Sequence, residues 1–261
     1  MSKQDGNGST AIVKASKYAI VTQHERALKV LKTNIGPGGI TERDLTLITI
    51  PTGGGTQWQT QTLKGEEHVD ALYGVPIMFK DVRLHWEKSY EETGGGEPPT
   101  CKTINDEASV GVGTPGGNCA VCPMNQWNED SPTGRKRCAL QRALFVCGPE
   151  DYLPFVFVLP VMSRIECVKY FVRLGSKGIN HFGTVLKYTL ATATNKTGIK
   201  YSKVQFELEE QLSPDVADQM QIVSEGMRQV LGGFSIAETV RKQESTYGNE
   251  ATGQSCRHTE T

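Results

Sequence analysis

The stretch VPIMFKDVRLHW, residues 75–86, alternates between apolar and polar side chains with a period of two. Met78 and Val82 fall on one side of the chain, whereas Asp81 and Arg83 fall on the other. This alternation predicts a long strand with one face in the core and the other face in water. The fold is therefore expected to be mainly β, in an α+β class.

Further strands and helices are expected on both sides of this stretch. Runs rich in β-branched and aromatic residues predict strands at 45–50, 58–62, 143–146, 155–161, 184–192 and 200–208. The last two flank Asn195–Gly198, which is a hairpin signal. Helices are expected from Thr22 to Asn34, from Ile165 to Leu174 after a Ser163 cap, and from Pro214 up to Gly232.

Between the long strand and the run at 143–146 lies a glycine-rich insertion, residues 92–142, which contains four cysteines. They follow the spacing C-x17-C-x2-C-x15-C and are Cys101, Cys119, Cys122 and Cys138. A Cys-x-x-Cys turn brings two thiolates to one ion, and two distant cysteines can complete a tetrahedral shell. Four soft sulfur ligands favour Zn²⁺. We therefore expect a structural zinc site that orders the insertion.

Two other uses of these cysteines stay open. They could be free thiols or a redox pair, although a redox Cys-x-x-Cys normally stands where a parallel strand leads into a helix. His85 and Glu87, taken with Cys119 and Cys122, also approximate the H-x-E and P-C-x-x-C signature of zinc nucleobase deaminases. In that arrangement Asn118 replaces the signature proline, and the other two cysteines have no role.

The net charge of −1 hides a strong segregation of charge along the chain. Between Arg164 and Lys203 there are eight basic residues and one acid, whereas Glu207–Glu225 holds six acids and no base. Aromatic residues are interleaved with the cations, a pattern that suits single-stranded nucleic acid. The residues expected to contact nucleic acid are Phe79, Arg83, His85, Arg135, Lys136, Arg137, Lys187, Lys200, Tyr201 and Lys203.

Several classes of protein are excluded at this stage. The longest apolar run, Tyr152–Met162, is too short for a membrane helix, and no secretion signal is visible. Seven cysteines without an export signal favour metal ligands or thiols in a reducing cytoplasm, which would be the host cytoplasm for a viral protein. Gly53–Gly55 lacks the ending of a phosphate loop, and no hydrolase pattern is present. We expect a disordered arm (1–16), one domain (17–234) and a disordered tail (235–261).

The order of strands, helix and hairpin around a zinc insertion resembles an OB-fold, a five-stranded barrel that commonly binds single strands. It is similar to zinc-bearing OB-folds of replication proteins, such as the C-terminal domain of the large subunit of eukaryotic replication protein A. The motif GGNCAVCPMNQW (116–127), followed by GRKRC (134–138), is similar to zinc segments of bacteriophage and mobile-element proteins. The resemblance implies a protein that acts on single-stranded DNA in replication or recombination.

The sequence thus predicts an OB-like β-barrel without enzymatic activity, which holds a structural zinc and binds single-stranded DNA through a basic, aromatic groove. RNA, a second copy of the chain, and host or phage replication proteins are further partners that the pattern leaves open. The main alternative is a protein-interaction module that regulates host transcription or defence. A zinc-dependent nucleobase deaminase is the enzymatic alternative.

Overall fold

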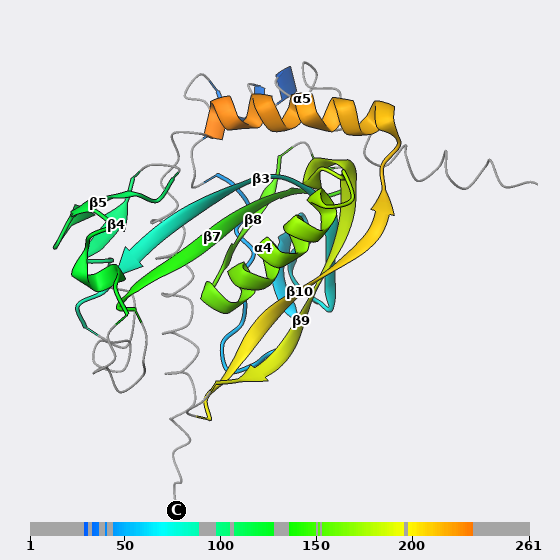
Figure 1. Ribbon diagram of the computed structural model, residues 1–261. Helices are drawn as coiled ribbons and strands as arrows, with labels where there is room; N and C mark the ends of the chain where they lie inside the picture. Colours follow the sequence, from blue (N-terminus) through cyan, green and yellow to red (C-terminus); the bar gives the residue numbers. More distant parts are fainter. Residues whose placement is uncertain are drawn as a thin grey trace, which may run out of the picture.

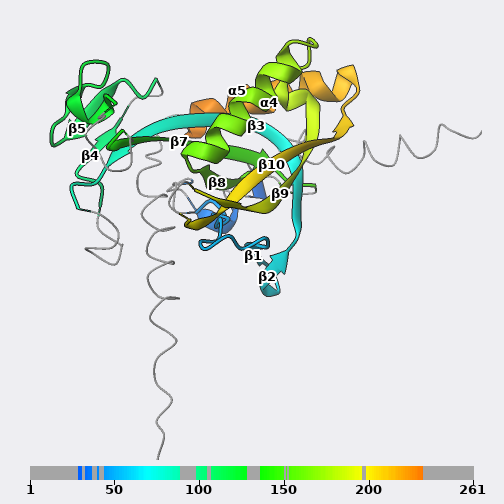
Figure 2. The same ribbon diagram turned by 60° about the horizontal axis from the view of Figure 1, so that its bottom comes forward.

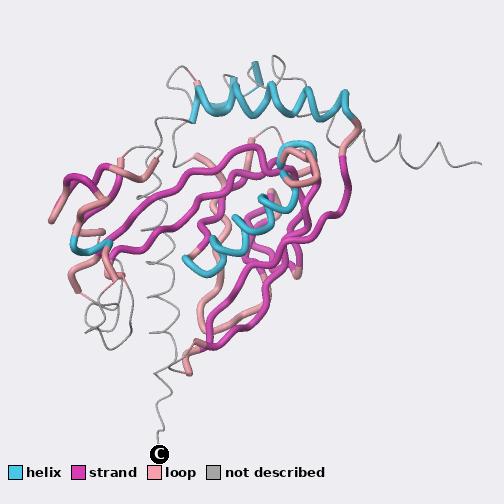
Figure 3. Tube along the Cα trace, in the orientation of Figure 1, coloured by secondary structure: helices cyan, strands magenta, loops and turns pink. Residues whose placement is uncertain are grey.

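The computed structural model describes residues 29–30, 33–36, 40, 44–88, 98–104, 107–127, 136–149, 151, 153–195 and 198–231. Their elements are, in chain order, β1 (Trp58–Thr62), β2 (Gly65–Val69), β3 (Ala71–His85), β4 (Cys101–Thr103), β5 (Val110–Gly113), β6 (Gly117–Asn118), η1 (Pro123–Asn125), β7 (Cys138–Cys147), β8 (Phe155–Leu159), α4 (Val161–Gly175), η2 (His181–Gly183), β9 (Thr184–Thr194), β10 (Lys200–Gln211) and α5 (Pro214–Leu231). The described part of the chain is mainly β, as predicted, with two long helices (Figure 3).

The long strand predicted from the alternating stretch is β3, which curves through the whole molecule (Figure 2). Its first four residues pair with β9, and most of the remainder pairs with β7. The register with β7 shifts between Pro76 and Met78, where proline has no N–H to donate. A Cβ at Gly74 would lie 2.5 Å from the carbonyl oxygen of Cys147, so only glycine permits this close approach.

The sheet runs in the order β10-β9-β3-β7-β8, and β4, β5 and β6 are added beside the C-terminal end of β3. Among the described strands it stays open and does not close into a barrel. The strand expected at 45–50 is an extended segment with isolated bridges, one from Leu47 to Val156 of β8 and one from Thr49 to Gln59 of β1. This segment therefore lies alongside β8.

Both faces of β8 and of the second half of β7 are buried, which explains their nearly continuous apolar runs. Alternate residues of β7 belong to two different cores: Ala143 and Phe145 face one, Leu144 and Val146 the other. The first core is completed by α5, which lies across one side of the sheet (Figure 1), through Met220, Val223, Met227 and Leu231. The second core gathers large side chains from the N-terminal segment, β8 and the hairpin, namely Ile48, Ile50, Trp58, Phe157, Leu186, Tyr188 and Val204.

Helix α4 differs from the prediction at its start. It begins at Val161 with Pro160 in the cap position, and Ser163 lies buried inside the first turn. The Ser163 hydroxyl oxygen instead accepts a hydrogen bond from the backbone N–H of Val204 on β10, at 3.1 Å. The predicted cap residue therefore ties the helix to the sheet. The predicted end of the helix, at Gly175, is confirmed.

The β3 face that was expected in water is half-buried, which corrects the prediction. Phe79 packs on Phe171 of α4 with ring centroids 6.0 Å apart. Asp81 is held by Arg142 of β7 and Arg164 of α4, at 2.7 and 2.8 Å. This face is polar because α4 and β7 place cations over it, and it is not polar because it faces water.

Most of the remaining predicted elements agree with the structure where it describes them, but the strand expected at 155–161 ends at Leu159, because Pro160 caps α4. Strand β1, the β9–β10 hairpin and the start of α5 at Pro214 are confirmed. Of the first expected helix, residues 29–30 and 33–35 are helical. The rest of that helix, the expected arm and the expected tail lie outside the described residues. No described helix is long and apolar enough to cross a membrane.

Candidate metal centre and nucleic-acid interface

The four cysteines of the insertion line one small cavity, of about 10 Å³, at the C-terminal end of β3. Strand pairing brings two of them there, because His85 is opposite Cys101 of β4 on one side and Cys138 of β7 on the other. Cys119 and Cys122 reach the same cavity from the turn between β6 and η1. The structure therefore gathers the residues that the spacing predicted as one set.

The thiols in this cavity influence one another electrostatically. Burial raises the pKa of Cys119, and it raises the pKa of Cys138 to about 11. The guanidinium of Arg83 lowers both pKa values, whereas the neighbouring cysteines raise them. Without a metal the thiols of Cys119 and Cys138 therefore keep their protons at neutral pH, and a bound cation would have to displace those protons.

Arg83 and Asn125 form a polar frame around the cavity. Arg83 donates from Nη1 to the Asn125 side-chain oxygen at 2.8 Å, and from Nε to the carbonyl oxygen of Ala108 at 3.1 Å. Asn125, which is buried, also donates to the carbonyl oxygen of Cys119 at 2.7 Å. One cation beside four sulfurs would offset part of the negative charge of a four-thiolate zinc site.

The donor set fits a structural zinc in type and in number. Four sulfurs around a cavity of this size leave space for an ion and little else. The described residues nevertheless contain no group of three or more His, Cys, Asp or Glu side chains already arranged to hold a metal ion. The four-cysteine zinc site therefore stays a prediction.

The deaminase alternative receives one supporting contact and meets two difficulties. His85 lines the same cavity as Cys119 and Cys122, and its Nδ1 lies 3.1 Å from the carbonyl oxygen of Arg137. Glu87, however, is exposed and does not line the cavity. The cavity is also far smaller than the roughly 300–1,000 Å³ of a small-molecule site.

The predicted cationic face of the hairpin is present in the register of β9 and β10. Lys203 is opposite Ala191, and Tyr201 is opposite Ala193, while Lys187 is opposite Glu207. Directly opposed residues of an antiparallel pair point to the same face, so these side chains share one side of the sheet. Lys200, at the start of β10, is exposed, but the alternation of side chains along the strand puts it on the side opposite to Tyr201 and Lys203.

Two lysines of this face have acidic neighbours. The Nζ atom of Lys203 lies 3.2 Å from Glu166 of α4, and that of Lys187 lies 3.4 Å from Glu207. The hydrogen bond from Lys203 lowers the pKa of Glu166. Ion pairs this accessible contribute about 0–1 kcal/mol, so a phosphate could replace the carboxylates at little cost.

The other predicted contact residues divide into interior and surface groups. Phe79, Arg83 and His85 make the internal contacts described above, and His85 is only 5% exposed. Lys136 and Arg137, at the edge of the insertion, are exposed. Arg135 lies outside the described residues.

Two exposed aromatic residues were missed by sequence reasoning. Tyr73 of β3 is 40% exposed and opposite Lys187, so it extends the hairpin face. Trp127 follows η1 in the insertion and is 71% exposed. Tyr73 lies just before the alternating stretch, and Trp127 lies where no period is visible, so no pattern indicated which way either ring would point.

Comparison of the chain with protein-family models, with curated proteins and with solved structures finds no match. Its function therefore has to be inferred from its own residues.

Proposed function

We propose that the chain is a non-enzymatic protein that binds single-stranded DNA through the β9–β10 face and the cysteine insertion. The observation that carries this proposal is the shared face of Lys187, Tyr201 and Lys203, which Tyr73 extends onto β3. Lysines on such a face contact phosphates without reading sequence, and tyrosine rings stack on unpaired bases.

The connections of the sheet support a relationship to OB-folds. Strand β3 pairs with both β7 and β9, β8 pairs with β7, and β10 pairs with β9, while α4 lies between β8 and β9 in the chain. OB-folds are five-stranded, partly open barrels whose loops after the first and fourth strands contact nucleic acid. In this chain those loops would be the cysteine insertion and the turn at Asn195–Gly198.

A structural zinc would support this function indirectly. The insertion has very short strands and lies apart from the two cores, so four zinc–sulfur bonds would supply its order. The cationic residues Lys136 and Arg137 lie next to Cys138, and the metal would hold them in place. In this proposal the ion takes no part in any chemical reaction.

A protein-interaction module is the second candidate, and one observation favours it. At the β4–β5 pair the backbone N–H of Ile104 donates to the carbonyl oxygen of Val110, and Val112, two residues farther along β5, shares that face; all three side chains are exposed. Exposed apolar side chains grouped in this way are common at protein interfaces. These apolar side chains are also compatible with a nucleic-acid surface. We favour the first proposal because Lys187 and Lys203 share the face of the β9–β10 hairpin.

A salt titration tests the proposed function. Binding of labelled 20-mers of single-stranded DNA, duplex DNA and RNA would be followed by fluorescence anisotropy between low and high salt. We expect the single strand to bind more tightly than the duplex, with log affinity falling by about 0.7 per contacted phosphate for each tenfold increase in salt. Equal or absent binding of single strand and duplex would overturn the proposal.

A charge variant makes the same experiment sharper. Glu166→Gln releases Lys203 from its ion pair, so the affinity for the single strand should rise a few-fold and the salt slope should steepen. Glu209→Gln, an exposed acid without a described ion pair, is the matched control for net charge. If both variants raise affinity equally, the effect is general repulsion, and the hairpin face is not the contact surface.

A further inference from the structure

Trp127 is the most exposed of the three tryptophans in the chain. Trp58 is fully buried at 0% exposure and Trp86 is half-buried, whereas Trp127 is 71% exposed. A large ring left in water gives up the stabilisation that burial would supply. The exposed position of Trp127 thus indicates that its ring contacts a binding partner.

The backbone that carries this ring is held in place by a network of hydrogen bonds. Asn125, two residues before it, is buried and bonds to Cys119, Arg83 and Lys136. The Gln126 side chain donates to the carbonyl oxygen of Ala120 at 2.9 Å. These hydrogen bonds fix the turn before Trp127 to the cysteine cavity. The backbone that carries the ring is therefore already ordered before any ligand binds.

A cation stands beside the ring. The Nζ atom of Lys136 lies 5.9 Å from the centroid of the Trp127 ring, over its face. Arg137, the next residue, is exposed. A large ring beside an amine offers what an unpaired nucleotide needs: a surface for its base and a positive charge for its phosphate.

We propose that Trp127 is a stacking platform for an unpaired base and that Lys136 contacts an adjacent phosphate. This inference rests on the proposed single-strand binding, and it adds a site on the insertion that is separate from the β9–β10 face. The ring faces solvent, so a base can reach it without any rearrangement of the core.

The test compares two ligands with equal backbone charge, an oligo(dT) 20-mer and an abasic 20-mer. Trp127→Ala should weaken oligo(dT) binding by roughly 5- to 150-fold and leave binding of the abasic strand unchanged. Trp127→Phe should fall between wild type and alanine, because a smaller ring still stacks. Val121→Ala, which removes another exposed apolar side chain from the same turn, is the matched control and should bind like wild type.

Each result separates the two proposals. If wild type binds oligo(dT) and Trp127→Ala binds equally well, the stacking site is wrong while single-strand binding stands. If the alanine variant weakens both ligands equally, the ring supports the fold and does not stack, which also overturns the inference. If wild type binds neither ligand at low salt, both proposals fail, and the exposed ring is left as evidence for a protein partner.

Discussion

Asp81 shows how a polar residue of β3 contributes to stability. Its carboxylate accepts hydrogen bonds from Arg142 and Arg164, and Arg142 also stacks on the Phe79 ring at 4.0 Å. Burial alone would raise the pKa of Asp81, but the hydrogen bonds from both guanidinium groups outweigh it and lower the pKa. This carboxylate joins β3, β7 and α4 at one point.

Asp81→Asn should lower the free energy of unfolding by about 3 kcal/mol at neutral pH, because it leaves two guanidinium groups partly buried without a counter-charge. Urea unfolding measures the change. The folded pKa of Asp81 lies below its unfolded value, so its contribution is present above about pH 4 and is lost as the pH falls through the folded pKa. The difference from wild type should therefore shrink in acid.

Asp218→Asn, at an exposed position on α5, is the control for this experiment and should unfold like wild type at every pH. An Asp81→Asn protein that matches wild-type stability at pH 7 would show that the cluster contributes nothing, despite its short contacts.

At the scale of elements, the insertion and the body of the sheet are stabilised in different ways. Strands β4, β5 and β6 contain three, four and two residues. Neither of the two apolar cores includes a residue of the insertion between β3 and β7. The insertion therefore depends mainly on the contacts around the cysteine cavity for its ordered structure.

We expect one zinc per chain by elemental analysis, lost in Cys101→Ser and retained in His85→Ala. The reason is that an all-sulfur site needs Cys101, whereas His85 only lines the cavity and contacts the backbone of Arg137. The reverse result, metal lost with His85→Ala and kept with Cys101→Ser, would support the deaminase arrangement. Cys147→Ser, in the fully buried part of β7, should keep the metal and is the control.

The two remaining described cysteines, Cys147 on β7 and Cys167 on α4, lie outside the insertion and differ from the other four in their surroundings. Burial raises the pKa of Cys147 to about 12 and that of Cys167 to about 11. Both thiols are inaccessible and protonated at neutral pH, so they suit core packing better than metal binding or redox chemistry.

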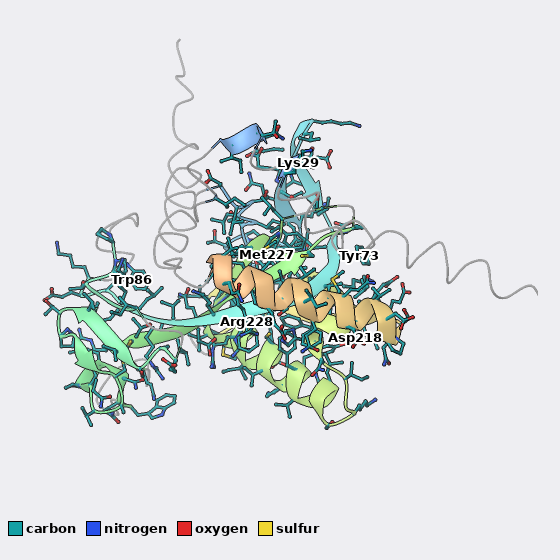
Figure 4. All side chains as sticks on the ribbon, turned by 90° about the horizontal axis from the view of Figure 1, so that it is seen from above. Lys29, Tyr73, Trp86, Asp218, Met227 and Arg228 are labelled. Atoms are coloured by element: carbon teal, nitrogen blue, oxygen red, sulfur yellow. The ribbon has the colours of Figure 1, made fainter. Side chains whose placement is uncertain are left out.

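At the scale of the whole molecule, β3 links two candidate contact regions. Figure 4 places Trp86 beside the insertion and Tyr73 toward the other end of the same strand. The acids that follow the basic segment lie at the end of β10 and on α5, while the hairpin lysines lie on the face of β9 and β10. Glu207 is an exception: it shares the lysine face and pairs with Lys187 at 3.4 Å, so the separation of charge along the chain is only partly kept in space.

Removal of metal by a chelator should unfold the insertion and leave the body folded. Hydrogen exchange would show fast exchange of the amides at 98–127 and continued protection of β7, β8 and β9, because both cores are formed without the insertion. The Cys101→Ser protein should exchange in the same way without chelator. Cooperative loss of protection across the whole chain would contradict this division.

Much of the fold could be predicted from local patterns. The period of two predicted β3, turn residues predicted the β9–β10 hairpin, and proline with glycine predicted the bounds of α5. The start of α4 was missed because Ser163, a good cap residue in isolation, is used in a contact with Val204 of β10. Such a contact depends on a partner far away in the chain, which no local pattern contains.

By itself the sequence determined the mainly β class, the presence of the longer strands and helices and the Cys-x-x-Cys turn, because turn chemistry, periodicity and short ligand spacing act between near neighbours. Cys101 and Cys138 reach that turn through strand pairing on both sides of His85. Only the tertiary structure decided which polar residues face water. It covered Asp81 and Arg83, and it left Tyr73 and Trp127 exposed. The physical reason is that exposure depends on which distant elements pack over a residue, and that packing is set by the whole fold.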